Sequence, residues 1–129
     1  MPSYLYVVES SKPFDETVEA VERKTAEKGF RVLHTHDVAA TLAEKGFPRE
    51  PMKIIEVCNA RYASEALNKD IRLAVMLPCP ICVYAERGKT LISTFRPSAI
   101  PSLFPESDVA TLAAKVDRIV LAIVDEAKE

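Results

Sequence analysis

Glycine is scarce in this chain, which has only Gly29, Gly46 and Gly88 among its 129 residues. Walker loops and dinucleotide-binding fingerprints need several glycines close together, because the backbone has to approach the phosphate groups. The glycines of this chain are too few and too scattered for either motif. The sequence therefore disfavours a phosphate site formed by backbone amides.

An excess of either charge is also missing. The chain has 17 Lys and Arg against 19 Asp and Glu, with a formal net charge of −2, and the two signs are interleaved. Proteins that bind a phosphate backbone usually carry a basic patch or stripe. We therefore expect no nucleic-acid partner.

Long hydrophobic runs are absent from the sequence, and no stretch approaches the length that a membrane-spanning helix needs. Residues 1–9 lack the basic, apolar and cleavage regions of a secretion signal. The cysteines number three, and an odd number does not suit a disulfide framework. We expect a soluble cytoplasmic protein with reduced thiols and no membrane partner.

What remains is an ordinary globular composition. Hydrophobic residues make up 48% of the chain and charged residues 28%, which separates it from disordered chains. A chain of 129 residues fits one domain and can bury a sizeable core. We therefore predict a single domain over residues 1–129.

Hydrophobic periodicity predicts strands that alternate with helices. Strands are expected at residues 4–9, 30–38, 53–58 and 71–77, followed by a hairpin of 81–85 with 90–95. The apolar stretch 71–77 is expected to be a central strand. Pro78 and Pro80 lack a backbone N–H, so strand pairing should falter there.

Small polar residues mark the starts of the expected helices. Ser10 or Ser11 can cap the first helix, Asn59 the third and Ser107 the last, with a short helix over 38–45. The last helix has apolar residues at three- and four-residue spacing. This stripe favours packing over a sheet rather than a coiled coil, which needs more heptads.

Cys58 and Cys79 are the leading candidate site residues. Cys58 ends a predicted strand directly before Asn59, so the following helix should favour its thiolate and lower its pKa. Cys79 follows the next predicted strand. If these strands are parallel, a right-handed crossover brings both thiols to one sheet edge, where open sheets commonly bind ligands. Alternatively, both are small buried hydrophobic residues, the commonest fate of free cysteine.

Cys79 and Cys82 form a C-x-x-C sequence in an extended setting. In thioredoxin-like motifs the first cysteine opens a helix, which lowers its pKa. Residues three apart on a strand point to opposite faces, so these two thiols should diverge unless Pro80 makes a bulge. A structural zinc site needs further ligands, and no second C-x-x-C exists.

His34 and His36 are the only histidines and would share a face of the strand expected at 30–38 with Val32. Two imidazoles at this spacing could bind one metal ion, with a cysteine completing the site. The alternative is that backbone groups or water satisfy both rings. Glu56 could lie on the same strand face as Cys58 and tune its thiol.

Two segments carry a resemblance to a known family. They are Ile54-Ile55-Glu56-Val57-Cys58-Asn59-Ala60-Arg61-Tyr62-Ala63-Ser64-Glu65-Ala66-Leu67 and Leu77-Pro78-Cys79-Pro80-Ile81-Cys82-Val83-Tyr84. With Gly88 and Pro97 they resemble the small bacterial and archaeal proteins called domain of unknown function 302. Further matching positions are Phe14, Gly29-Phe30, Asp37, Leu42 and Lys45-Gly46.

The resemblance implies an α+β fold in two layers, with a mixed, mostly antiparallel sheet backed by helices, and often a homodimer. It also implies that the family's cysteine positions are Cys58 and Cys79, with Asn59 beside the first. The family has no settled activity, although relatives are often associated with sulfur metabolism or redox proteins. This chain has Ala60 where the family usually has proline, and Cys82, His34 and His36 are additional.

We therefore expect a small cytoplasmic thiol-bearing binding domain, with Cys58 as the more reactive sulfur and Cys79 as its partner. Such a pair could carry a sulfur species, form a reversible disulfide, or bind a soft metal or haem iron. The alternative is a non-catalytic dimerisation or partner-binding module in which the cysteines only pack. A small-molecule hydrolase is a third possibility, but no nucleophile with its base stands out.

Overall fold

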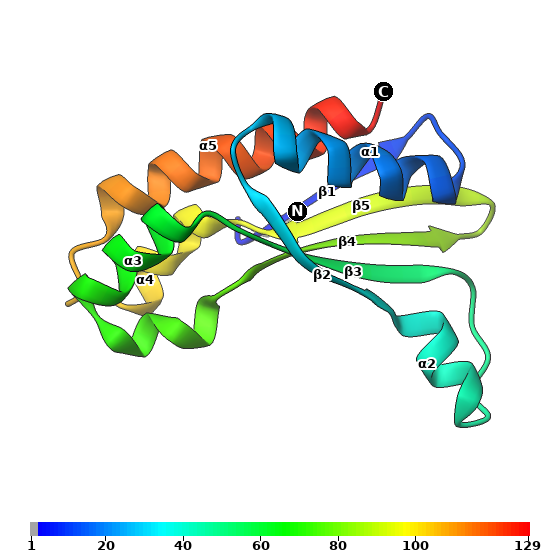
Figure 1. Ribbon diagram of the computed structural model, residues 1–129, viewed down its shortest axis with the longest axis horizontal. Coiled ribbons are helices and arrows are strands. Elements are labelled where there is room, and N and C mark those ends of the chain that lie inside the picture. Colours follow the sequence, from blue (N-terminus) through cyan, green and yellow to red (C-terminus); the bar gives the residue numbers. More distant parts are fainter. Residues whose placement is uncertain (1–2) are drawn as a thin grey trace.

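The computed structural model describes residues 3–129, which form two layers, a sheet and the helices that cover one of its faces (Figure 1). The strands are β1 (Leu5–Ser10), β2 (Arg31–Asp37), β3 (Met52–Cys58), β4 (Cys79–Glu86) and β5 (Lys89–Phe95). The described residues form a five-stranded sheet of order β1-β5-β4-β3-β2, and every adjacent pair is antiparallel. The predicted α+β class is confirmed.

The helices differ greatly in length. They are α1 (Phe14–Glu27), α2 (Val38–Glu44), α3 (Ala60–Lys69), α4 (Ile100–Leu103) and α5 (Ala110–Ala127), with 3-10 helices η1 (Ile71–Met76) and η2 (Pro97–Ala99). The short helices η2 and α4 lie in the segment after β5, which contains Pro97, Pro101 and Pro105. Within residues 3–129, no helix combines the length and apolarity needed to cross a membrane.

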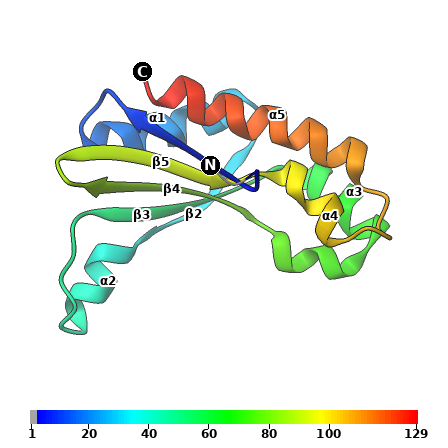
Figure 2. The same ribbon diagram turned by 180° about the vertical axis from the view of Figure 1, so that it is seen from behind.

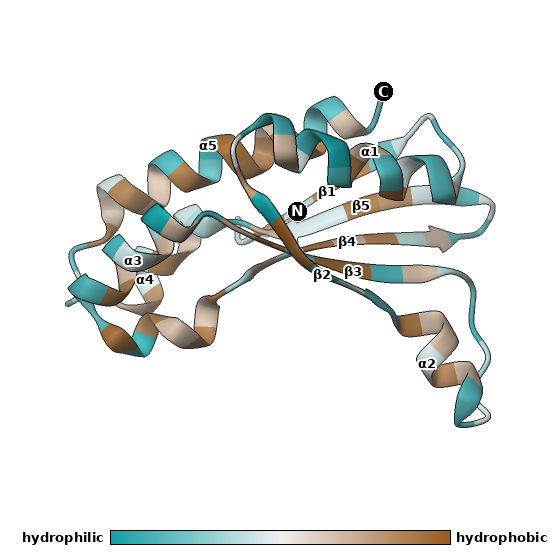
Figure 3. Cartoon of the chain, viewed as in Figure 1, coloured by the Kyte–Doolittle hydropathy of each residue, from teal (hydrophilic) through white to brown (hydrophobic). Residues whose placement is uncertain are grey.

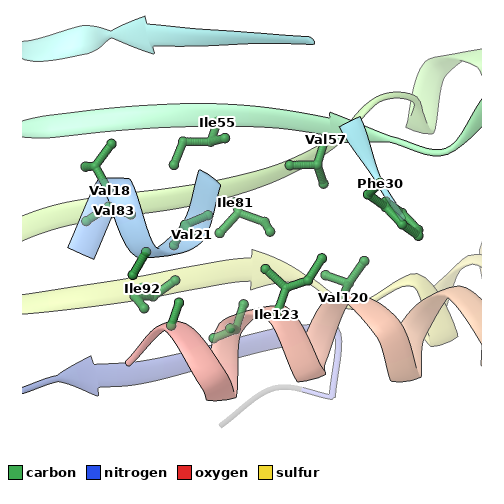
Figure 4. Close-up of a cluster of buried hydrophobic side chains, with 13 residues drawn as sticks. Val18, Val21, Phe30, Ile55, Val57, Ile81, Val83, Ile92, Val120 and Ile123 are labelled. Carbon is green, nitrogen blue, oxygen red and sulfur yellow. The ribbon is translucent and has the colours of Figure 1, made fainter. Parts of the chain in front are cut away.

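The core lies between the sheet and the two long helices, α1 and α5 (Figure 4). Alternate residues of the central strands point toward these helices, as the two-residue period of a strand requires. The strand side chains of this core are fully buried, namely Ile55, Val57, Ile81, Val83 and Ile92. The apolar stripe of the last helix therefore packs over a sheet, as predicted.

The hairpin that joins β4 to β5 is confirmed. Glu86 pairs with Lys89, which leaves Arg87 and Gly88 as a two-residue turn. Both turn residues have positive φ, 52° and 80°, the combination that a tight hairpin turn requires. Gly88 therefore stands where a residue with a Cβ atom would be strained.

The strand predicted at 71–77 is wrong, because Ile71–Met76 form the 3-10 helix η1. The Asp70 carboxylate accepts a hydrogen bond from the Arg72 amide at 3.0 Å and so caps the first turn. Leu73 is buried, whereas Ile71 and Val75 are 77% and 78% exposed. A short apolar run fits a strand or a helix equally well, and here the local cap favours the helix.

Pairing of β4 with β3 continues through Pro80, so the interruption predicted there is wrong, whereas Pro78 lies outside the strands, as predicted. Pro80 lies opposite Glu56 of β3, and its carbonyl accepts a hydrogen bond from the Thr94 hydroxyl at 2.8 Å. Pairing of β4 with β5 begins at Ile81, so the missing amide of Pro80 removes no bond from that ladder.

Two of the predicted serine caps are also wrong. Pro13 occupies the cap position of α1, and Ser10 instead bonds the Thr17 hydroxyl at 2.8 Å. Val109 occupies the cap position of α5, whereas the Ser107 hydroxyl donates to the Phe104 carbonyl at 2.7 Å. In both places the serine hydroxyl makes a local hydrogen bond other than the helix cap, and serine side chains favour such local bonds as much as caps.

A β-bulge in β2 changes which face its residues occupy. Val32 lies opposite the core residue Val57, but the register shifts before His34, which lies opposite Glu56. The predicted common face of Val32 and His34 is therefore wrong, because the extra residue, Leu33, reverses the alternation. His34 and His36 still share a face, and it is the one turned away from α1 and α5.

Candidate functional site

Cys58 and Asn59 lie where β3 ends and α3 begins. The side-chain oxygen of Asn59 accepts a hydrogen bond from the Tyr62 amide at 3.1 Å, so the predicted helix cap is confirmed. Its side-chain nitrogen donates to the Gly29 carbonyl at 3.0 Å. Asn59 therefore joins α3 to the turn between α1 and β2, and its polar atoms are used by the fold.

Cys58 and Cys79 lie on neighbouring strands but leave opposite faces of the sheet. β3 and β4 are antiparallel, so the predicted parallel crossover is wrong. Cys79 lies directly opposite the core residue Val57 and packs against the core, whereas Cys58 is the next residue along β3. Successive residues of a strand point to opposite faces. Vectors that diverge in this way disfavour a disulfide between the two thiols.

Cys82 is separated from both of these thiols. It lies opposite Ile54 and Ser93 on the face away from the helices, so it points away from Cys79, as predicted. Cys58 is four residues beyond Ile54, which places it about 13 Å from Cys82 along the strand direction. All three cysteines are free, and the strand geometry does not bring them together.

Burial raises the pKa of each thiol. For Cys58, desolvation outweighs the opposing hydrogen bond from the Asn59 backbone, so the predicted lowering of its pKa is wrong. Burial, with a smaller contribution from nearby Cys58, raises the pKa of Cys79 to about 11. Burial also raises the pKa of Cys82, although a hydrogen bond with Ser93 opposes it. Neutral thiols therefore dominate at pH 7.

Cys79 borders a small apolar cavity at one end of the sheet. The cavity has a volume of about 60 Å³ and lies between α3, η1, α4 and α5. Its other walls are aliphatic, proline and methionine side chains, among them Leu73, Met76, Ile100 and Leu112. A space of this size holds only a few atoms, so a haem does not fit, whereas a small sulfur species does.

His34 and His36 contact each other beside Glu56. The two ring centroids are 4.3 Å apart in an edge-to-face arrangement, and His36 Nε2 lies 3.2 Å from Glu56 Oε1. Glu56 therefore contacts a histidine rather than tuning Cys58. Within the part of the chain that the structure describes, no group of three or more His, Cys, Asp or Glu side chains is arranged to hold a metal ion. Metal binding by the two histidines stays a hypothesis.

The second face of the sheet is apolar at its centre, and among residues 3–129 no long helix covers it (Figures 1 and 2). We call this surface the open face. Its apolar side chains are all half-exposed and come from β1, β3, β4 and β5, namely Leu5, Val7, Ile54, Cys82, Tyr84, Leu91 and Phe95. Figure 3 shows hydrophobic residues along these strands as well as on α1 and α5.

Charged and polar groups lie at the margins of the open face. On one side are His34, His36 and Glu56 of β2 and β3. On the other side, Lys89 Nζ lies 3.6 Å from Glu9 Oε1, on β5 and β1. A hydrophobic centre inside a polar margin is the usual composition of a protein–protein interface.

Comparison with known proteins places this architecture in a family. The model of the domain of unknown function DUF302 matches residues 6–127. The chain belongs to this family. It is also similar to a solved crystal structure, that of an uncharacterized conserved DUF302 protein from Bacillus stearothermophilus, with 31% identity and a TM-score of 0.91 over 98% of this chain and 99% of that one. A comparison with curated proteins gives no match.

The open face of this DUF302 chain was missed by the reasoning from sequence, although a signal for it exists. Residues 91–95 read Leu-Ile-Ser-Thr-Phe, with apolar side chains on both faces of the strand. Only the first and the last of the expected helices are long, and two long helices suffice to cover one face of a sheet. Apolar strands in excess of the helices that can cover them indicate an interaction surface.

Proposed function

We propose that this protein is a non-catalytic dimerisation module, in which the open faces of two copies pack against each other. The observation that carries this proposal is the open face itself, an apolar sheet surface with no helix of residues 3–129 over its centre. Two sheets packed face to face bury their apolar side chains in a shared layer about 10 Å thick. A homodimer is therefore the assembly that this face fits.

The size of the open face supports a dimer. Five strands spaced about 4.8 Å apart, each presenting about 20 Å of length, give a flat footprint of about 480 Å². Side-chain relief raises the accessible area above this footprint, toward the roughly 800 Å² per partner of a standard interface. The polar margin and apolar centre can match a second copy, because a two-fold interface uses the same patch twice.

The test is the native mass of the purified protein by light scattering or sedimentation over a range of concentrations. We expect twice the chain mass of 14.3 kDa. Leu91→Lys places an ammonium group among the apolar side chains of the open face, beside Tyr84 of β4, while the neighbouring carboxylate of Glu9 is already paired with Lys89. This change should raise the dissociation constant about 100-fold or more, since buried charges without a partner are strongly unfavourable.

Ala114→Lys is the matched control, because it adds the same charge to an exposed position of α5 on the opposite layer. It should leave the dimer unchanged. A wild-type protein that is monomeric at all concentrations, or a Leu91→Lys protein that remains a dimer with unchanged affinity, contradicts the proposal. Circular dichroism of each variant establishes that it is folded.

A second candidate is a thiol-bearing binding domain in the cytoplasm, supported by the position of Cys79 beside the apolar cavity. A polarizable sulfur in an otherwise apolar pocket suits a small, soft ligand, such as a sulfur species. The cavity volume argues against the haem alternative.

Native mass spectrometry of protein incubated with inorganic polysulfide tests this second candidate, because the Cys79 thiolate can cleave an S–S bond of polysulfide, take up one sulfur atom and release a polysulfide that is one sulfur shorter. Binding at the cavity predicts a mass gain that Cys79→Ala abolishes and Cys82→Ala retains, because Cys82 lies on the other face. A gain that depends on Cys82, or the absence of any gain, removes this candidate. Cys58→Ala reports whether the neighbouring thiol takes part.

A further inference from the structure

Helix α2 is well formed but contributes no buried side chain. The Asp37 carboxylate accepts a hydrogen bond from the Ala40 amide at 2.9 Å and caps its start. At its other end Gly46 has φ of +86°, and the Phe47 amide donates to the Leu42 carbonyl at 2.9 Å. All seven residues of α2 remain exposed or half-exposed, and Phe47 is 66% exposed.

A helix of this length needs packing to be stable. Isolated helices shorter than about 12 residues are marginal in water, so tertiary contacts usually supply the stability of a two-turn helix. Within this chain α2 packs mainly against β3, at the corner of the sheet. Its own chain therefore leaves it incompletely covered.

An open groove separates α2 from the open face. The groove has a volume of about 420 Å³. Val38, Thr41 and Leu42, which share one side of α2, face Ile54, His36 and Glu56 across it. The groove therefore has room for side chains from another molecule.

The position of α2 relative to the sheet indicates that a second copy of this chain could supply these side chains. Figures 1 and 2 show α2 projecting beyond the ends of β2 and β3, on the side opposite α1 and α5. An α-helix is about 10 Å across, and two sheets packed face to face are also about 10 Å apart. A second sheet on the open face would therefore lie at the same level as α2, alongside its apolar side.

We propose that α2 is a contact arm that packs against the edge of a second copy of this chain, whose side chains fill the groove. This inference rests on the proposed dimer and adds a distinct part to its interface. The contact area is in keeping with this, because the accessible area of the open face approaches the roughly 800 Å² per partner of a standard interface and the arm adds to it. One side of a seven-residue helix adds about 100 Å² of continuous apolar surface.

Hydrogen exchange tests the arm directly. In a wild-type dimer, the amides at the end of α2, residues 42–44, should exchange at least about tenfold more slowly than in the Leu91→Lys protein, where the partner is lost. The amides of α5, which are held by the core of each copy, should exchange equally in both proteins. Equal exchange of α2 in the dimer and the monomer would overturn the arm.

Substitution of the groove-facing side of α2 gives an independent test. The double variant Val38→Ala, Leu42→Ala keeps good helix formers but removes the apolar contacts, and it should raise the dimer dissociation constant about tenfold. Ala43→Gln, at an exposed position outside the groove, is the matched control and should leave the constant unchanged.

The two proposals fail in distinguishable ways. If the wild type dimerises and Leu91→Lys dissociates it, but the α2 double variant keeps the wild-type constant within twofold, the arm is wrong and the open-face dimer stands. If the wild-type protein is a monomer at every concentration, the dimer and the arm are both wrong.

Discussion

At the scale of single residues, the cysteines show how strand geometry limits thiol chemistry. Cys58 and Cys79 are adjacent across β3 and β4, yet their side chains point to opposite faces of the sheet. The start of α3 beside Cys58 does favour the thiolate, but desolvation has the larger effect and raises its pKa. Position next to a helix N-terminus is therefore not sufficient for a reactive thiol.

We predict that Cys79 resists alkylation in the native protein. Its pKa is raised to about 11 from the ordinary 9.0, so its thiolate fraction near pH 8 is about 100-fold below that of a free cysteine. Iodoacetamide labelling followed by peptide mass spectrometry should show slow modification of Cys79. In denaturant all three cysteines should react at similar rates. Modification of native Cys79 at the denatured rate would contradict the burial argument.

Asp117 anchors α5 to the segment after β5. It is 5% exposed, bonds Arg96 Nη2 at 2.9 Å and accepts a hydrogen bond from the Ser98 amide at 3.0 Å. Burial by itself would raise the pKa of Asp117, but the hydrogen bonds from Arg96 and Ser98 outweigh it and hold the pKa below its ordinary 3.8. The ionised form is thus part of the native structure.

Asp117→Asn should lower the free energy of unfolding by about 2 kcal/mol at pH 7, because it breaks charge-assisted hydrogen bonds at a buried site. The native pKa is depressed, so the stability contributed by Asp117 is present above its unfolded pKa and is lost as pH falls through the lower native pKa. Urea unfolding across pH should show the difference in stability between the two proteins shrinking as the pH falls below the ordinary pKa of 3.8. A difference that persists there would assign the effect to packing instead.

At the scale of elements, short polar signals decided the local structure. Asn59 and Asp37 lie directly before helices that their side chains cap, and Asp70 caps η1 in the same way. The cap at Asp70 explains why an apolar segment became a helix rather than a strand. The bulge at Leu33, in contrast, is not set by a neighbouring polar side chain. It follows from the pairing of β2 with β3, which are distant along the chain.

Asn59→Ala should lower the free energy of unfolding by about 1 kcal/mol, the usual effect of removing a helix cap. Both Asn59→Ala and Asn59→Asp lose the hydrogen bond to the Gly29 carbonyl, but Asn59→Asp keeps the side-chain oxygen that caps α3. The loss of stability should therefore be larger for Asn59→Ala. Denaturant unfolding of the two variants measures this order. A larger loss for Asn59→Asp would indicate that repulsion between its carboxylate and the Gly29 carbonyl outweighs the retained cap.

At the scale of the whole molecule, the balance of layers is the leading feature. Two long helices cover one face of the sheet, and the opposite face keeps half-exposed apolar residues such as Leu91 and Phe95. Soluble proteins rarely expose contiguous apolar surface of this kind without a partner. This imbalance is the reason for placing dimerisation ahead of thiol chemistry.

The proposed dimer would make thermal stability depend on protein concentration. When unfolding dissociates the dimer, we expect the Tm to rise by about 2–3 °C for each tenfold increase in concentration. Leu91→Lys should have a lower Tm that does not change with concentration. Differential scanning fluorimetry or calorimetry over a hundredfold concentration range measures this. A wild-type Tm independent of concentration would contradict a dimer that dissociates on unfolding.

The sequence by itself determined the local elements. Three features depend only on residues close together along the chain: the hairpin turn at Arg87 and Gly88, the cap at Asn59 and the apolar stripe of α5. Over such short distances, steric and hydrogen-bonding preferences act directly. The resemblance carried by Cys58, Asn59 and Cys79 also identified the family correctly.

Only the tertiary structure decided how these elements face one another. Antiparallel pairing of β3 with β4 separates Cys58 from Cys79, and the bulge before His34 turns the histidines to the open face. These outcomes depend on strand order and register, which are set by contacts between distant segments, and a shift of one residue reverses every side chain. The candidate site therefore moved from a pair of thiols to an uncovered sheet face.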